Sequence, residues 1–535
     1  MTTAAPNLVQ QAQPALELAP GGVNPWLVAV AVMLGTFMEV LDTTIINVAL
    51  PHIAGNLSAG VDESTWVLTS YLVSNAIVLP IAGWLAQRFG RKRFFMTCIV
   101  LFTLSSMACG TAPNLQFLIF WRVVQGFSGG ALQPLSQAIL LESFPRRLHG
   151  MAMAVFGFGV VIAPIIGPTL GGWLTDNYSW RWCFYINLPV GILAALLIQF
   201  VVFDPPYLRA RSRQPIDYIG LGLLAVGLGA LQVVLDKGER EDWFESAWLT
   251  RLALLSAACL TLLIIWELRV AHPVVELRAL RDRNLALGTA IMFGFGVALY
   301  GSTVLYPIFL QNLMGYTALW SGWALSPGAI ATLLLMPVSG RLTARVDVRR
   351  LVTFGLIVCT WSLFMMSRFN LHASFATVAW PRIVMGVGMA FTFVPLTAAT
   401  FAFVPREAMG NATGLFNLMR NIGGSVGIAA VTTLLAQRAQ FHQSVLAAHV
   451  TAYDPYVFST LQRVEHLLRT TAAPRLPAIG TPPAAALLYG ELQRQATMNA
   501  VIDCFTVLGV VLACLVVGAL LLRRPTHAVG PAALH

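Results

Sequence analysis

Two carboxylates, Glu39 and Asp42, lie in a long apolar run near the start of the chain. Residues three apart share one face of a helix, so the two acids would point the same way. A charge at membrane depth costs a few kcal/mol or more, and such residues usually face a water-filled cavity. Burial and mutual repulsion both favour the protonated carboxyl. We therefore expect both acids to take part in proton coupling and to line a substrate cavity, with Asp42 as the main proton site. The alternative is a pair of buried acids satisfied by a neighbouring helix.

Arg122 lies well inside a second apolar run, three residues before Gln125. A buried guanidinium needs a partner, and the acids of the first run are available for that role. The pattern predicts that Arg122 takes part in proton coupling and that Gln125 lines the cavity, although a purely structural ion pair is an alternative. Arg382 and Arg420 are basic residues in later apolar runs. We place them in the substrate cavity as weaker candidates that could instead be structural.

A short segment between two apolar runs is rich in glycine and arginine. Gly83 would allow close approach of helices, and Gly90 would allow a tight turn. Arg88 and Arg91 could bind the carbonyl groups at the end of the preceding helix. These four residues predict a gate on one side of a membrane rather than a substrate site.

A later apolar run carries closely spaced glycines and prolines. Small residues let helices approach closely, and proline bends a helix. We expect this helix to lie at the interface between moving bundles. The gate and conformational residues predicted in it are Pro164, Gly167, Pro168, Gly171 and Gly172.

The composition indicates an integral membrane protein. The chain has 535 residues, of which 57% are hydrophobic and 10% charged, whereas soluble domains carry about 25% charged residues. The apolar runs are continuous and helix-length, unlike the short alternating segments of a β-barrel. We therefore expect an all-α polytopic fold. The net charge of +10 could indicate nucleic-acid binding, but the basic residues lie mostly in short loops, so we predict no nucleic-acid partner.

Signatures of an enzyme or a metal protein are missing. The seven cysteines lie in or beside apolar runs and lack Cys-X-X-Cys spacing. We find no His-Glu-X-X-His zinc motif and no Walker phosphate loop. We therefore predict no enzyme activity, no metal and no cofactor, with a proton gradient as the energy source.

We predict fourteen membrane-spanning helices. Loops after even-numbered spans are rich in arginine, whereas the short loops after spans one, three and nine contain no Lys or Arg. Because cationic loops favour the cytoplasm, we expect a multi-pass protein of the bacterial inner membrane with both termini cytoplasmic. The approximate spans are 27–50, 65–86, 94–112, 115–140, 150–174, 184–203, 217–235, 247–267, 285–310, 320–342, 350–369, 375–400, 410–435 and 499–522.

The second half of the chain repeats motifs of the first. Residues 83–93 match 340–350, and residues 122–126 match 382–386. Parallel six-helix repeats imply two bundles about an axis normal to the membrane, with a site between them. The two acids of the first span have no counterpart in the second half, which favours a functional role for them.

The repeat divides the chain into seven parts. These are a cytoplasmic tail (1–26), an N-terminal six-helix bundle (27–203), two inserted transmembrane helices with their loops (204–284), the first five helices of a C-terminal bundle (285–435), a long periplasmic loop (436–498), the last transmembrane helix (499–522) and a cytoplasmic tail (523–535). In the long loop, 436–470 and 483–498 have helical character, and 473–477 and 480–483 are rich in turn residues. This loop is either a solvated cap or a docking surface for a periplasmic partner.

Several segments resemble motifs of one family. They are residues 41–51, 83–93, 118–126, 159–172, 180–191 and 236–238. Their combination is similar to the major facilitator superfamily, in particular to the fourteen-span drug:proton antiporters of the EmrB/QacA type. The chain departs from the superfamily pattern at Gln87, where an acid is usual. The gate could therefore lack a charge pair unless Glu142 supplies the carboxylate.

The resemblance implies a fold of two six-helix bundles with two inserted helices. It implies multidrug efflux by alternating access, in which hydrophobic or amphipathic drugs and toxic compounds leave in exchange for protons, with Arg122 implicated in proton transfer. The implied partners are small-molecule amphipathic substrates, protons, membrane lipids, a periplasmic membrane-fusion adaptor and an outer-membrane channel. Two other functions stay open: a dedicated exporter or importer of one metabolite, siderophore or lipid, and a non-transporting assembly or receptor protein.

Overall fold

The computed structural model describes residues 24–145, 148–204, 217–450, 455–471 and 483–523. The described residues are mainly helical and include no β-strand. Within them, thirteen helices are long and apolar enough to cross a membrane. This confirms the predicted all-α polytopic fold. Residues 1–23 and 524–535 of the predicted tails lie outside the described part of the chain.

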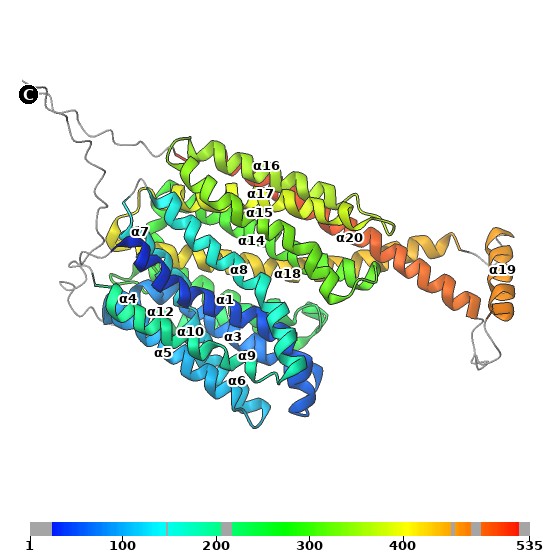
Figure 1. Ribbon diagram of the computed structural model, residues 1–535, viewed down its shortest axis with the longest axis horizontal. Coiled ribbons are helices and arrows are strands. Elements are labelled where there is room, and N and C mark those ends of the chain that lie inside the picture. The colour runs from blue at the N-terminus through cyan, green and yellow to red at the C-terminus, as the bar shows by residue number, and fades with distance from the viewer. Residues whose placement is uncertain (1–23, 146–147, 205–216, 451–454, 472–482, 524–535) are drawn as a thin grey trace, which may run out of the picture.

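The first half of the chain forms one bundle, in blue and cyan in Figure 1. Residues Trp66–Phe89 form one apolar span although a 3-10 turn interrupts them, and Trp182–Val201 form another. The elements of this half are α1 (Pro25–Asn56), α2 (Val61–Ser64), α3 (Trp66–Val78), η1 (Leu79–Ile81), α4 (Ala82–Phe89), α5 (Arg91–Gly110), α6 (Leu115–Gly129), α7 (Leu132–Ser143), α8 (His149–Asn177), α9 (Trp182–Tyr185) and α10 (Asn187–Val201).

The fourth predicted span, 115–140, forms two helices, α6 and α7. The break follows Gly129 and Gly130 and precedes Pro134, which has no N–H to continue the helical hydrogen bonds. Gly130 lies directly against the backbone of Asn75 in α3, so a side chain at position 130 would not fit. The span is therefore present but divided, and for this reason neither part reaches membrane-spanning length alone.

The inserted hairpin and the second half follow. Polar residues that precede the apolar runs cap several of these helices, since Asp217, Asp282 and Ser374 accept bonds from backbone N–H groups of the first turn. The elements are α12 (Tyr218–Lys237), η3 (Trp243–Glu245), α13 (Ala247–Arg269), η4 (Leu277–Arg281), α14 (Arg283–Ile308), η5 (Phe309–Leu313), α15 (Ala318–Thr343), α16 (Val348–Met366), α17 (Phe375–Thr400), η6 (Arg406–Ala408), α18 (Met409–Ala448), α19 (Pro455–Thr471) and α20 (Pro483–Leu520).

Two symmetric contacts join the halves. α18 packs against α4, η1 and α7, and α8 packs against α15 and α17. Gly83 of α4 touches the backbone at Gly410 of α18, and Gly150 of α8 touches the backbone of Gly340 in α15. Gly83 and Gly340 are equivalent in the sequence repeat, so the two contacts have the same construction. Both contacts lie at the start of a helix, since Gly150 and Gly410 are the second residues of α8 and α18. The labels of α4 and α7 mark one end of the molecule in Figure 1.

The inserted hairpin contacts both bundles. In α12, Lys237 donates a hydrogen bond from Nζ to Thr65 Oγ1 at 2.7 Å. Just beyond α12, Trp243 donates from Nε1 to Thr433 Oγ1 of α18 at 2.9 Å. α13 packs mainly on α12. The hairpin therefore lies beside α3 of the first half and α18 of the second.

The region predicted as a long loop, 436–498, consists largely of helix. α18 has 40 residues, which span about 60 Å at 1.5 Å per residue, twice the ~30 Å hydrocarbon core. α20 starts at Pro483, well before the predicted start at 499. Both helices extend past the bundles, and α19 lies at their far end (Figure 1). Residues 473–477 and 480–482 of the predicted turns lie outside the described chain.

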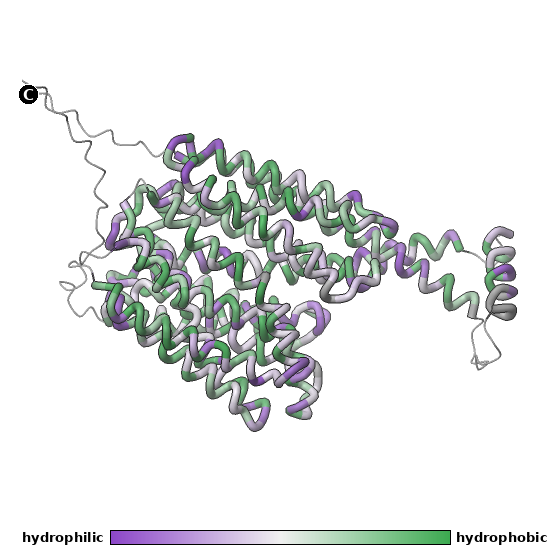
Figure 2. Tube along the Cα trace, in the orientation of Figure 1, coloured by the Kyte–Doolittle hydropathy of each residue, from purple (hydrophilic) through white to green (hydrophobic). Residues whose placement is uncertain are grey.

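Charged and polar residues hold this extension together. Arg438 of α18 donates from Nε to Asp503 Oδ2 of α20 at 2.6 Å, and His442 Nε2 lies 2.8 Å from the same oxygen. Figure 2 shows hydrophobic residues along most of the bundle helices and hydrophilic residues at their ends and at the base of the extension. The pattern is that expected for helices that leave the membrane.

Candidate functional site

Asp42 of α1 lies at the centre of a buried cluster. Arg122 of α6 donates from Nη1 to Asp42 Oδ2 at 2.6 Å, and both side chains are 0% exposed. The amides of Gln125 and Asn187 donate to Asp42 Oδ1 at 2.9 and 2.8 Å. Three helices, α1, α6 and α10, thus meet at one carboxylate. Charge-assisted bonds of this kind compensate for the loss of water around a buried ion pair.

The guanidinium of Arg122 is held on several sides. Its Nε donates to the carbonyl of Val67 in α3 at 3.0 Å, and its Nη1 also donates to Gln125 Oε1 at 2.9 Å. Its Cζ lies 4.2 Å from the ring centroid of Tyr71. Among the described residues, Nη2 of Arg122 has no hydrogen-bond partner. The arginine is therefore oriented toward Asp42 and keeps one donor group unused.

Glu39 forms a second cluster, separate from Arg122. Tyr71 donates from its hydroxyl and Asn75 from its amide to Glu39 Oε1, both at 3.2 Å. Gln133 of α7 donates to Glu39 Oε2 at 2.5 Å. Both acids of α1 are buried, but Arg122 pairs with Asp42 alone. Tyr71 joins the two clusters, because its ring lies over Arg122 and its hydroxyl binds Glu39.

The Glu39 cluster reaches into the second half of the molecule. Arg420 of α18 donates to Oε1 of Gln133, whose amide nitrogen binds Glu39. Nearby, Asn417 of α18 donates to Gln137 Oε1 at 2.7 Å. A single glutamine side chain thus connects a carboxylate of the first bundle to a guanidinium of the second.

Arg382 belongs to neither cluster. It lies in α17, with its Cζ 5.1 Å from the ring centroid of Tyr306 in α14. Its Nε and Nη1 are buried and have no hydrogen-bond partner among the described residues. The structure therefore brings together Glu39, Asp42, Arg122 and Gln125 on the first half and adds Arg420 through Gln133, but it leaves Arg382 apart.

One of the predicted gate residues, Gly83, lies where the halves meet. Gly83 packs against the backbone of α18, as its small size requires. Gln87, which replaces the usual acid, donates from Nε2 to the carbonyl of Glu407 at 3.1 Å. Arg88 lies in the last turn of α4, and Gly90 ends the helix with φ +85°, a left-handed value that favours glycine. Gln87 therefore makes a neutral hydrogen bond across the halves.

Arg91 has a partner within its own bundle. It donates from Nη1 to Glu142 Oε2 of α7 at 2.5 Å, and both side chains are 6% exposed. The suggestion that Glu142 supplies a carboxylate to this segment agrees with that contact. Lys92 donates from Nζ to the carbonyl of Gln199 near the end of α10. A basic residue thus binds a C-terminal carbonyl, but that of α10 rather than of the preceding helix α4.

The glycines of α8 face two different neighbours. Gly167 and Gly171 lie four residues apart and pack on Thr44 and Ile45 of α1, within the same bundle. Gly150 and Gly157, the second and ninth residues of α8, pack instead on α15 of the other half. The expectation of an interface between bundles therefore applies to the first turns of α8, whereas the predicted glycines 167 and 171 bind α8 to α1.

The other predicted residues of α8 make looser contacts. Pro164 and Pro168 lie inside the helix, which continues through both. Gly172 has only Val48 within ordinary contact distance of an added Cβ. The close approach of α8 to α1 thus depends on one face of the helix.

Several partners of the two acids were not singled out from the sequence. All four are uncharged, and they come from three spans: Tyr71 and Asn75 from α3, Gln133 from α7 and Asn187 from α10. An amide inside an apolar run is a signal that could have drawn attention to Asn187, Asn75 and Gln133. The backbone carbonyl of Val67 carries no such signal.

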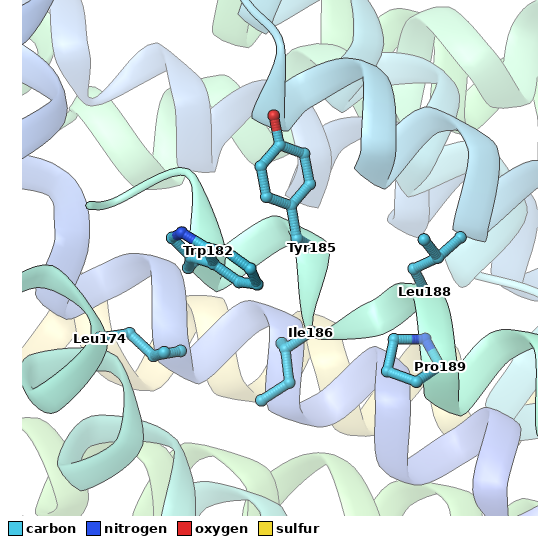
Figure 3. Close-up of a pocket in the computed structure, with 6 residues that line it drawn as sticks. All are labelled: Leu174, Trp182, Tyr185, Ile186, Leu188 and Pro189. Carbon is cyan, nitrogen blue, oxygen red and sulfur yellow. The ribbon is translucent and has the colours of Figure 1, made fainter. Parts of the chain in front are cut away.

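A shallow apolar hollow lies apart from these clusters (Figure 3). It contains none of the predicted site residues, and Trp182 in its wall is 49% exposed. Its lining residues are Leu174, Trp182, Tyr185, Ile186, Leu188 and Pro189. It offers contact to apolar groups but no charge.

The chain is similar to known membrane proteins over most of its length. It is 42% identical over 437 residues to the multidrug export protein EmrB of Haemophilus influenzae, covering 80% of this chain and 84% of that protein. It is 39% identical over 445 residues to the fatty acid resistance protein FarB of Neisseria gonorrhoeae, covering 82% and 86%.

A solved structure and a family model give the same result for the fold. The crystal structure of the human organic anion transporter MFSD10 superposes with a TM-score of 0.62 at 12% identity, covering 92% of this chain and 99% of that one. The family model described as Major Facilitator Superfamily matches residues 32–428. With the two bundles and the repeated contacts at Gly83 and Gly340, these similarities show that the chain belongs to the Major Facilitator Superfamily.

Proposed function

We propose that this protein is a proton-coupled antiporter that exports hydrophobic or amphipathic drugs and toxic compounds by alternating access. The similarity to the multidrug export protein of Haemophilus influenzae supports the export of such compounds. The observation that carries the proton coupling is the buried pair of Asp42 and Arg122. Among the described residues, no other carboxylate forms an ion pair in which both side chains are 0% exposed.

Asp42 exchanges its proton as follows in this proposal. In the described form, Arg122 neutralises the carboxylate and two amides occupy its other oxygen. Protonation removes the charge of Asp42 and leaves Arg122 as an unpaired cation, which is costly at membrane depth. The bundle then favours a different packing of α1 against α6 and α10. Proton binding thereby changes the relative free energies of two conformations, as coupling requires.

Glu39 couples substrate to the same movement. It is linked through Gln133 to Arg420 on the other half. A substrate that binds Glu39 would compete with Gln133 and weaken that link across the bundles. Glu39 and Arg420 thus line the substrate cavity in this proposal, whereas Asp42, Arg122 and Gln125 form the proton site.

The described conformation is closed on the cytoplasmic side. The two close glycine contacts between the halves lie beside the arginine-rich loops. Cationic loops favour the cytoplasm, which supports our proposal that both termini are cytoplasmic. Opening on that side requires Gly83 to separate from α18 and Gly340 from α8.

The helical extension is the docking surface for a periplasmic adaptor that leads to an outer-membrane channel. α18 and α20 pass well beyond the bundles on the side opposite the glycine contacts (Figure 1). Exposed large apolar side chains on this extension include Phe441, Tyr456, Phe458, Leu487 and Tyr489. Exposed apolar groups outside the membrane favour binding to another protein.

A dedicated exporter of one lipid-like compound is the second candidate function. The printed name of the Neisseria relative, a fatty acid resistance protein, favours it. The fold and the proton site would be the same in both cases, and only the substrate range would differ.

Ethidium efflux from intact cells tests the proposed function. Cells that express the protein should expel the dye, and a protonophore should stop this efflux. Arg122→Ala should reduce it to the level of cells without the protein, at equal expression. Efflux that continues at the full rate with the protonophore present would exclude proton coupling.

A further inference from the structure

Arg382 is a membrane-embedded guanidinium without an anionic partner. It is the eighth residue of α17 (Phe375–Thr400), so it lies about 10 Å from the end of the helix. The side chain is half-buried, and its Nε and Nη1 are inaccessible and unbonded within the described part of the chain. Its one cation–π contact is with the face of Tyr306. That ring is fixed, since the hydroxyl donates to the carbonyl of Val378 at 2.6 Å.

The sequence repeat shows what Arg382 lacks. Its counterpart in the first half is Arg122, which has Asp42 and Gln125 as bonded partners and Tyr71 over its face. At the positions equivalent to Gln125 and Tyr71, the second half has apolar Met385 and Gly328.

The equivalence of Gly328 and Tyr71 is structural as well as sequential. Gly126, in the Arg122 helix, packs on the carbonyl of Tyr71, and Gly386, in the Arg382 helix, packs on the carbonyl of Gly328. The second half thus keeps the guanidinium and the helix packing. It has lost the side chains that satisfy the guanidinium in the first half.

We propose that Arg382 and the face of Tyr306 form a binding subsite for the carboxylate of amphipathic organic anions with an apolar body. An unpaired cation at membrane depth costs a few kcal/mol or more, and an anion that reaches it removes that cost. A guanidinium forms charge-assisted hydrogen bonds with a carboxylate. This inference rests on the proposed export function and names a substrate class for it.

The surroundings of Arg382 favour a ligand with an apolar body. Tyr306 contacts Phe369, with ring centroids 6.3 Å apart, and Phe369 stacks on Phe309. Met385, one turn further along α17, is buried. These side chains are buried in the described form, so an alkyl chain would contact them only after the surrounding helices move apart. A small hydrophilic anion would lose its hydration without gaining such contacts.

Binding of dodecanoate to the purified full-length protein tests the subsite. The measurement is equilibrium binding in nanodiscs of phosphatidylcholine, with methyl dodecanoate as the uncharged probe and ethidium as the cationic one. Arg382→Gln should weaken dodecanoate binding about tenfold or more, because a charge-assisted pair is lost. Binding of methyl dodecanoate and ethidium should change less than twofold. Arg368→Gln, an exposed arginine beyond the end of α16, is the matched control and should bind all three as the wild type does.

Two further experiments distinguish ligand binding at Arg382 from a structural role of the arginine and from binding of a lipid headgroup. Arg382→Lys keeps the charge and should retain part of the dodecanoate affinity, which a purely packing role for the arginine would not explain. If Arg382→Gln and Arg382→Lys both weaken the binding of all three probes, the arginine is structural and the subsite is excluded. If dodecanoate binds only in phosphatidylcholine and 20% phosphatidylglycerol abolishes that binding, the site belongs to a lipid headgroup and the proposal is wrong.

The subsite and the proposed transport function can fail separately in these tests. Suppose that ethidium efflux depends on the proton gradient but dodecanoate binding does not depend on Arg382. The subsite would then be excluded and the antiporter function retained. If dodecanoate binding depends on Arg382 but the protein exports neither dodecanoate nor ethidium, the subsite is retained and the export function is excluded.

Discussion

At the scale of residues, two neighbouring acids of the first bundle have different hydrogen-bond partners. Asp42 receives a guanidinium and two amides, whereas Glu39 receives a hydroxyl and two amides. Asp42 is thus the carboxylate that has a cation in direct contact. A group in this setting suits proton exchange, because its charge decides whether Arg122 is paired or not.

Asn187 provides a direct test of the Asp42 cluster. Asn187→Leu removes one donor from the carboxylate while leaving Arg122 in place, and it should lower coupled ethidium efflux about tenfold, the value of one bond to a charged group. Initial efflux rates at equal expression would measure this. Asn177→Leu is the control, because the Asn177 side chain is exposed and binds only the carbonyl of Trp173. Equal rates in the two variants would show that the amide is dispensable.

Gln133 tests the link between the halves. Gln133→Leu should separate Glu39 from Arg420 and remove the group that competes for Glu39. It should therefore strengthen binding of cationic substrates and change their affinity more than the affinity of neutral ones. A double-mutant cycle with Arg420→Leu in an ethidium binding assay measures the coupling, which we expect at about 1 kcal/mol. A coupling energy of zero would mean that the two residues act separately.

At the scale of elements, small residues allow helices of different bundles to touch. Gly83 and Gly340 occupy equivalent positions of the repeat and pack on α18 and α8. The sequence predicted close approach at Gly83. It did not distinguish the faces of α8, since glycines at 150, 157, 167 and 171 all lie in one apolar run and the choice of neighbour depends on distant helices.

A pair of substitutions in α15 tests the gate contact. Gly340→Leu should overpack the α15–α8 contact and reduce efflux strongly, with a stability loss of about 1–3 kcal/mol at most. Gly322→Leu lies in the same helix where nothing comes within 4 Å of an added Cβ. Efflux rates and thermal unfolding of both variants give the comparison. A Gly340→Leu protein with normal efflux would show that this contact is not part of the gate.

At the scale of the whole molecule, the charged residues of the apolar runs were informative because a charge at membrane depth is costly. This is why Asp42 and Arg122 could be identified before their contact was known. Neutral partners such as Asn187 carry a smaller cost and were missed. The predicted span ends near 435 because hydrophobicity falls there, whereas helical character is predicted to continue. No Gly or Pro follows until after Ala448, and α18 runs on to that residue.

The extension can be tested apart from transport. Replacing α19 (Pro455–Thr471) by a short flexible linker should leave ethidium transport in liposomes unchanged and should abolish drug resistance in cells. The reason is that only the cell assay needs delivery beyond the periplasm. Resistance that persists at normal expression would exclude a docking role for α19.

The most direct measurement of proton coupling is transport by the purified protein in liposomes under an imposed pH gradient. The wild type should move ethidium against its concentration gradient while protons flow the other way. Asp42→Asn should bind ethidium and exchange it down its gradient but should fail to use the pH gradient. If Asp42→Asn drives uphill transport as the wild type does, Asp42 is not the proton site.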